Sequence, residues 1–165
     1  METIKYLCFS GGGVRCLSFC SSIKLMEERG VRSQIKGIVG SSGGAITAAL
    51  FAVGYTADEM NEILRTTDFT KFKDSSWSIF GDVYQLFYYF GLYDTNNFET
   101  WFGQLLKKKT GSEGITFKEL LDTYGIELVI TGTSLTKRLT HYYNPHDNPD
   151  MPIKLAVRIS MSYPI

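Results

Sequence analysis

The 165 residues are enough for one domain with a substantial core and too few for two, so we predict a single domain over residues 1–165. The 44% apolar and 21% charged fractions are those of an ordinary globular protein. The 17 basic and 17 acidic residues cancel, so no excess of positive charge indicates a nucleic-acid partner.

The first half of the chain alternates strand and helix patterns. Residues 4–9 are a short apolar run that ends in Ser10 and three glycines, which predicts a buried strand entering a loop. Apolar residues then recur at helical spacing over residues 14–30, with Gly30 as the C-terminal stop. Residues 35–39 predict a second strand, and residues 45–53 are apolar on every side, as in a helix buried behind a sheet.

The second half repeats the alternation. Two capping boxes, at Thr56 and Thr116, predict helices that run to about Arg65 and Tyr124. The remaining predicted elements are a helix over 96–109, strands over 126–130 and 139–143, and a last helix over 152–159 opened by Pro152. Strands that alternate with helices predict an α/β fold, with a mainly parallel sheet flanked by helices.

Residues 37–57 carry no charge and are about as long as a membrane-spanning helix. The glycines and serines of residues 40–44 divide them, however, and favour a strand, a tight turn and a buried helix. The N-terminus has no apolar core behind a basic region and does not match a signal peptide. We expect a cytoplasmic protein that makes at most peripheral contact with membranes.

The three cysteines, Cys8, Cys16 and Cys20, are an odd number without paired C-x-x-C spacing. This pattern argues against a disulfide framework and against a zinc site. We expect the three thiols to be reduced, free of metal and mostly buried.

The stretch from Gly40 to Gly44 spells G-x-S-x-G, with Ser42 at its centre. A predicted strand precedes it and a predicted buried helix follows, which is the setting of a nucleophile elbow. Such a turn holds a serine above the sheet edge, and Gly40, Gly43 and Gly44 are the small residues that its crowding requires. We therefore predict Ser42 as a catalytic nucleophile, the alternative being a structural turn with an incidental serine.

A second glycine loop, Gly11-Gly12-Gly13-Val14-Arg15-Cys16, also lies between a strand and a helix. The pattern G-x-G-x-x-C is close to a dinucleotide fingerprint, but cysteine stands at the close-packed position and no acidic residue ends the second strand. The other use of such a loop is an oxyanion hole formed by the N–H groups of Gly11, Gly12 and Gly13.

These two loops, in this order and at this separation, resemble those of the patatin-like phospholipases. That family has a G-G-G-x-[RK]-G loop, a G-x-S-x-G elbow and an aspartate in a D-G-[GA] motif. Segments 115–120, 131–135 and 156–164 also resemble the family, so the likeness covers nearly the whole chain and is weakest over 66–95.

The chain departs from the family pattern at two places. Cys16 stands where the glycine loop usually has a final glycine. No D-G-G or D-G-A occurs, and Asp147 and Asp150 lie ahead of the segment that the family's aspartate follows. We therefore expect a patatin-like fold that is truncated at its C-terminus, before the catalytic base.

The resemblance implies a lipid acyl hydrolase of the phospholipase A type, which acts through a serine–aspartate dyad without a cofactor or a metal. It implies attack by Ser42 on a phospholipid or other acyl-ester lipid, with oxyanion stabilisation by the glycine loop. Arg15 is a candidate for contact with a lipid phosphate or, equally, a structural arginine paired with a neighbouring acid. Because the base is absent, little or no activity is expected of residues 1–165 themselves.

Two other interpretations stay open: a non-catalytic or inactive lipid-binding fragment, and a nucleotide-binding module. A hydrolase with a Ser–Asp–His triad is not supported. It would need His141 or His146, which lie in a predicted strand and a proline-flanked turn and are expected to be ordinary residues of those elements.

Residues 77–93 contain eight aromatic side chains, as a lid or a membrane-facing segment would. An aromatic core helix explains the same residues, because several of them fall at helical spacing.

Overall fold

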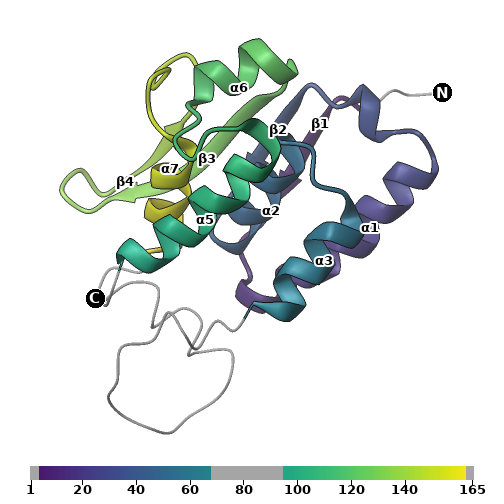
Figure 1. Cartoon of the computed structure of the whole chain (residues 1–165). Coiled ribbons are helices and arrows are strands. Elements are labelled where there is room, and N and C mark those ends of the chain that lie inside the picture. The colour runs from purple at the N-terminus through teal and green to yellow at the C-terminus, as the bar shows by residue number, and fades with distance from the viewer. Residues whose placement is uncertain (1–3, 68–94, 163–165) are drawn as a thin grey trace, which may run out of the picture.

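In the computed structural model, which describes residues 4–67 and 95–162, four strands form one sheet in the order β1-β2-β3-β4 (Figure 1). The strands are β1 (Tyr6–Phe9), β2 (Gly37–Gly40), β3 (Glu127–Ser134) and β4 (Leu139–Tyr143). The first three are parallel, and β4 runs antiparallel to β3. The prediction of an α/β fold with a mainly parallel sheet is confirmed. The aromatic segment 77–93 lies outside the described residues.

The helices lie close to the predicted ranges. They are α1 (Leu17–Glu28), α2 (Gly43–Ala52), α3 (Ala57–Thr66), α5 (Thr95–Thr110), α6 (Phe117–Tyr124) and α7 (Ile153–Met161), with short 3-10 turns η1 (Gly13–Cys16) and η2 (Arg32–Gln34). No helix in the described ranges is both long enough and apolar enough to cross a membrane. Residues 37–57 instead form β2, the turn and α2, as predicted.

Both predicted capping boxes are present. The Thr56 hydroxyl accepts a hydrogen bond from the Glu59 backbone N–H at 3.2 Å, and the Glu59 carboxylate accepts one from the Thr56 N–H at 2.8 Å. Thr116 and Glu119 repeat the arrangement at the same two distances. Each box satisfies backbone donors that a helix N-terminus otherwise leaves unpaired, so these two starts could be predicted from local sequence.

The two faces of the sheet differ in burial. Ile38, Leu128 and Ile130 share the face on which α2 packs, and each is at most 1% exposed. Tyr6 points to the opposite face and is 72% exposed. Right-handed crossovers between neighbouring parallel strands place the connecting helices on one side, as Figure 1 shows for α2 and α5. Helix α7, which follows the last strand, packs on the same side.

The burial expected of the cysteines is confirmed for two thiols and wrong for the third. Cys16 and Cys20 are buried, but Cys8 is exposed. Successive residues of a strand point to opposite faces, so Cys8 shares the exposed face with Tyr6 while Phe9 is buried. Residues 4–9 are nearly all apolar, so the sequence does not indicate which face of the strand the helices cover and which face stays exposed.

The third strand is longer than predicted. It continues through Gly132 to Ser134, although a Thr-Gly pair would ordinarily suggest the end of a strand. A Cβ atom at Gly132 would lie 2.8 Å from Cε2 of Tyr143 and 3.2 Å from Cγ2 of Ile159. This glycine therefore gives β4 and α7 room to approach the strand, and does not end it.

Candidate active site

Ser42 lies between the last residue of β2 and the first residue of α2, with φ 51° and ψ −125°. A side chain other than glycine seldom adopts positive φ, because Cβ then crowds the backbone, and the strain is of order 1–3 kcal/mol. The strand–turn–helix setting predicted for the G-x-S-x-G stretch is therefore present, with the strained residue at the serine itself. The half-buried Ser42 also stands at the N-terminus of α2, where a developing negative charge is favoured.

The glycines of the elbow are required by space. A Cβ atom at Gly40 would lie 2.7 Å from Cα of Ala45 and 2.7 Å from Cβ of Ala48. A Cβ atom at Gly44 would lie 2.5 Å from the Ser10 carbonyl oxygen and would overlap the Phe9 carbonyl. Gly40 and Gly44 thus allow α2 to start directly against β2 and the end of β1.

The glycine loop after β1 lies beside the elbow. Phe9 and Gly40 are partners in the parallel register, so both loops leave the same edge of the sheet. A Cβ atom at Gly11 would lie 3.4 Å from Cβ of Ser42, which places the two loops in contact. Gly13 has φ 58° and is buried against the first turn of α2.

The loop presents unpaired backbone donors next to Ser42. Gly11 is exposed and Gly12 is half-buried, and neither N–H donates a hydrogen bond to any other residue in the described ranges. Gly13 is buried, so its N–H is less accessible than those of its neighbours. The arrangement can bind an oxyanion through the backbone N–H groups of this loop, in which Gly11 lies against the serine.

Helix α7 holds the elbow from the other side. The Ser42 backbone N–H donates a hydrogen bond of 2.8 Å to Oγ of Ser160. The Ser42 hydroxyl contacts Sδ of Met161 at 3.9 Å, which is a weak interaction. These positioning contacts could not be predicted from the sequence, because Ser42 and Ser160 are 118 residues apart and no local pattern joins them.

No candidate base reaches Ser42 in residues 4–67 and 95–162. The Ser42 hydroxyl forms no hydrogen bond there with a carboxylate or an imidazole. His146 lies 3.3 Å from Glu127, at the start of β3, and His141 packs edge-on against Tyr143 at 4.6 Å between ring centroids. Asp147 accepts a hydrogen bond from Asn144 at 2.7 Å. These contacts do not support the triad interpretation.

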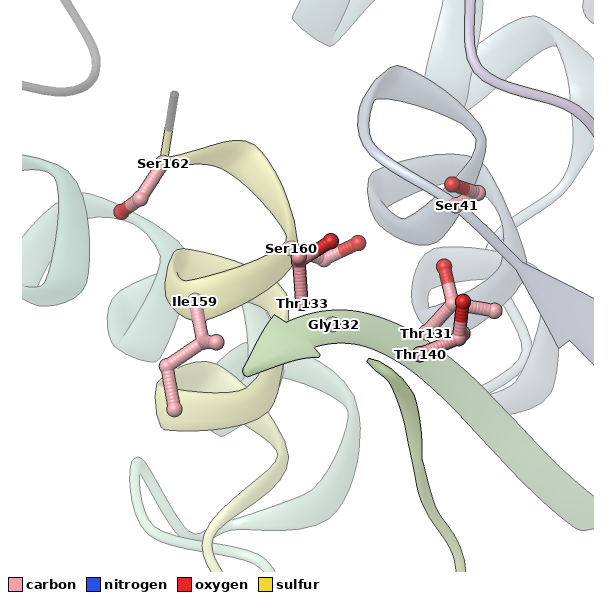
Figure 2. Close-up of a pocket in the computed structure, with 8 residues that line it drawn as sticks. All are labelled: Ser41, Thr131, Gly132, Thr133, Thr140, Ile159, Ser160 and Ser162. Atoms are coloured by element: carbon pink, nitrogen blue, oxygen red, sulfur yellow. The ribbon is translucent and has the colours of Figure 1, made fainter. Parts of the chain in front are cut away.

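A pocket of about 340 Å³ adjoins the elbow. Its lining is polar and uncharged, and consists of Ser41, Thr131, Gly132, Thr133, Thr140, Ile159, Ser160 and Ser162. Figure 2 shows the Ser41, Thr131, Thr140 and Ser160 side chains around one space, whereas Ile159 and Ser162 point away from it. The pocket can therefore receive a polar group beside the nucleophile candidate.

Arg15 is exposed at the start of α1, within η1. Its carbonyl accepts a hydrogen bond from the Ser18 hydroxyl at 2.7 Å, while its guanidinium forms no ion pair with the described residues. The suggested pairing with a neighbouring acid is thus not found there. Among residues 4–67 and 95–162, the side chain stands on the glycine-loop surface as a cation without an acidic partner.

Cys16 occupies the position of the family's last loop glycine, underneath the elbow. A Cβ atom at Gly43 would lie 3.3 Å from its sulfur, so the thiol fills the space between η1 and α2. Burial, with a smaller contribution from Cys20, raises the pKa of the Cys16 thiol to about 11. The thiol is therefore neutral at pH 7 and is not a competing nucleophile. No group of three or more metal-binding side chains occurs in the described part of the chain.

The chain is similar in sequence to two viral proteins. An uncharacterized protein of Acanthamoeba polyphaga mimivirus is 32% identical over 163 residues, which are 98% of this chain and 52% of that protein. A probable lipid hydrolase of Invertebrate iridescent virus 6 is 27% identical over 98% of this chain and 54% of its own length. The chain thus spans about half the length of these relatives.

The fold matches a solved structure. Full-length ExoU of Pseudomonas aeruginosa, in complex with full-length SpcU, superposes with a TM-score of 0.73 at 21% identity, over 99% of this chain and 39% of that one. A family model described as patatin-like phospholipase matches residues 7–165. The chain belongs to the patatin-like phospholipase family.

Proposed function

We propose that this chain carries the nucleophile half of a lipid acyl hydrolase, with Ser42 as the nucleophile. The observation that carries the proposal is the strained φ of 51° at Ser42, beside a glycine loop in which the N–H groups of Gly11 and Gly12 have no partner among the described residues. Strain of this kind persists where the surroundings hold it, and it is concentrated at functional sites. Family membership and the lipid hydrolase named among the relatives support the same substrate class.

The reaction follows from the positions of these groups. The Ser42 oxygen attacks the carbonyl carbon of a fatty-acyl ester, and the N–H groups of Gly11 and Gly12 stabilise the oxyanion. The alcohol part of the lipid leaves with a proton, and Ser42 remains acylated. Attack by water then releases the fatty acid and restores the serine hydroxyl.

The proton of Ser42 needs an acceptor that the described residues do not place beside it. By family resemblance this acceptor is an aspartate of a D-G-G or D-G-A motif, which the 165 residues do not contain. We therefore propose that such an aspartate belongs to the rest of a longer protein. A non-catalytic, lipid-binding role for residues 1–165 alone is the second candidate, because Ser42 has no base in the described ranges.

The test compares the 165-residue chain with a longer natural form that contains the D-G-G or D-G-A aspartate. We expect the longer form to hydrolyse phospholipid and short-chain esters, and Ser42→Ala to abolish this hydrolysis while the thermal unfolding curve stays native-like. Labelling by a fluorophosphonate should be strong in the longer form, weak in the short chain and absent after Ser42→Ala. Ser33→Ala, an exposed serine on η2, is the matched control.

Two outcomes would contradict the proposal. Hydrolysis that survives Ser42→Ala in the longer form would remove the nucleophile assignment. Full activity in residues 1–165 would show that the base is already present in this chain. Proteolysis resistance of both forms checks that neither result reflects misfolding.

A further inference from the structure

The β3–β4 hairpin ends in an exposed tip, residues 134–139, which projects beyond the helices (Figure 1). Leu135 is 63% exposed and Leu139 is 64% exposed, on the two sides of the turn. Tyr142, farther along β4, is 54% exposed. Two large apolar side chains exposed at one projecting tip, Leu135 and Leu139, indicate a surface that a lipid phase or another molecule covers.

The same tip is cationic. Lys137 and Arg138 lie between the two leucines, and both are exposed. Neither side chain forms an ion pair in residues 4–67 and 95–162, although eight ion pairs form elsewhere in those ranges. No Asp or Glu occurs between Glu127 and Asp147, so the hairpin itself supplies no counter-charge.

The base of the hairpin lines the pocket beside Ser42. Thr133 pairs with Thr140 across the two strands, and both line that pocket together with Ser41 (Figure 2). Thr133 lies two residues before Leu135, and Thr140 directly follows Leu139. A surface bound at the tip therefore meets the protein at the edge where the site opens.

We propose that the tip of the β3–β4 hairpin docks on the surface of an anionic lipid membrane, with Leu135 and Leu139 entering the interface and Lys137 and Arg138 facing the headgroups. The choice of a lipid surface rests in part on the proposed function, because the substrate is then an acyl lipid. Apolar side chains flanked by basic ones are the combination that binds an interface through both area and charge. A second copy of the chain is the poorer fit, since its own hairpin offers no acidic partner for the two cations.

The test is flotation of the 165-residue chain with vesicles, a measurement that needs no turnover. We expect binding to vesicles of phosphatidylcholine with 20–30% phosphatidylserine, weakening as salt is raised. Leu135→Ser with Leu139→Ser should lower the partition coefficient about 10- to 100-fold. Lys137→Gln with Arg138→Gln should lower it roughly 20-fold on anionic vesicles and hardly at all on pure phosphatidylcholine.

Matched controls lie on other surfaces. Leu25→Ser removes an exposed leucine of α1, and Lys36→Gln removes an exposed cation just ahead of β2, at the opposite edge of the sheet. Both should leave flotation unchanged, and thermal unfolding verifies that every variant is folded.

Three results would overturn the proposal. They are no flotation of the parent chain, flotation of the hairpin variants equal to that of the parent, or a parent chain that is dimeric by size-exclusion chromatography while the hairpin variants are monomeric and float unchanged. Equal flotation of the variants would place the membrane contact elsewhere. A change in oligomeric state alone would identify a second copy of the chain as the occupant of the tip. Because flotation does not depend on Ser42, binding without any Ser42-dependent hydrolysis would leave the docking surface standing while the proposed function fails. Ser42-dependent hydrolysis without hairpin-dependent flotation would leave the proposed function standing while the docking surface fails.

Discussion

The two glycine-rich loops at the site use glycine for different physical reasons. In the elbow, Gly40 and Gly44 stand where a single added carbon would come within 2.7 Å or less of backbone atoms. In the loop after β1, the nearest neighbours of an added carbon lie at 3.4 Å for Gly11 and 3.5 Å for Gly12, which is ordinary contact. The elbow glycines therefore maintain packing, whereas Gly11 and Gly12 keep the space around their N–H groups open.

The largest effect is expected at the centre of the elbow. Gly44→Ala should lower the free energy of unfolding by about 3 kcal/mol or more, because the Phe9 and Ser10 carbonyls cannot move away without disturbing β1. Urea unfolding of the 165-residue chain measures it. Gly114→Ala, where an added carbon meets nothing within 4 Å, should change that free energy by less than about 1 kcal/mol. Equal stability of the two variants would show that the space around Gly44 is not as restricted as described.

The next effect concerns Cys16, which fills the space between the two loops. Its pKa is raised by burial to about 11, so the unfolded state loses this proton at lower pH than the folded state. The free energy of unfolding is therefore unaffected by ionisation of this thiol below about pH 9. It falls by on the order of 2–3 kcal/mol as the pH rises from about 9 through about 11. Unfolding curves at pH 8 and pH 10.5 should therefore diverge more for the parent than for Cys16→Ala. Parallel behaviour of the two proteins would mean that the thiol is not buried as described.

A smaller change of opposite sign is expected at the strained serine. Ser42→Gly should raise the free energy of unfolding by about 1 kcal/mol. Glycine adopts φ near 51° without strain, and its larger loss of backbone entropy on folding offsets only part of that stabilisation. Ser42→Ala keeps the Cβ and should not show this gain. A decrease for Ser42→Gly would indicate that the turn carries no strain.

The smallest effect on stability is expected at Gly11, where the effect on function is larger. Gly11→Ala should change the free energy of unfolding by less than about 1 kcal/mol, since the added carbon makes an ordinary 3.4 Å contact with Cβ of Ser42. In the longer, base-containing form it should lower kcat/KM for a short-chain ester at least tenfold, because that carbon narrows the space for the oxyanion. Unchanged kcat/KM would argue against an oxyanion role for this loop.

Local sequence predicted most elements of this fold because their signals act within a few residues. The capping boxes at Thr56 and Thr116, the fully apolar helix after the elbow and the stop at Gly30 all depend on neighbours in the chain. Two predictions needed more than that. The strand from Glu127 runs past Gly132 because Tyr143 and Ile159 approach it, and Cys8 is exposed because of the face to which its strand turns it.

The sequence by itself determined the order of strands and helices, the two glycine loops and the position of Ser42 at a strand-to-helix turn, because turn geometry and helix periodicity are short-range properties. Only the tertiary structure decided what surrounds that serine. The hydrogen bond from Ser42 to Ser160, the pocket between the elbow, α7 and the hairpin, and the projection of Leu135 and Leu139 depend on segments far apart in the chain. Such contacts are set by how helices pack on a twisted sheet, and no local pattern encodes them.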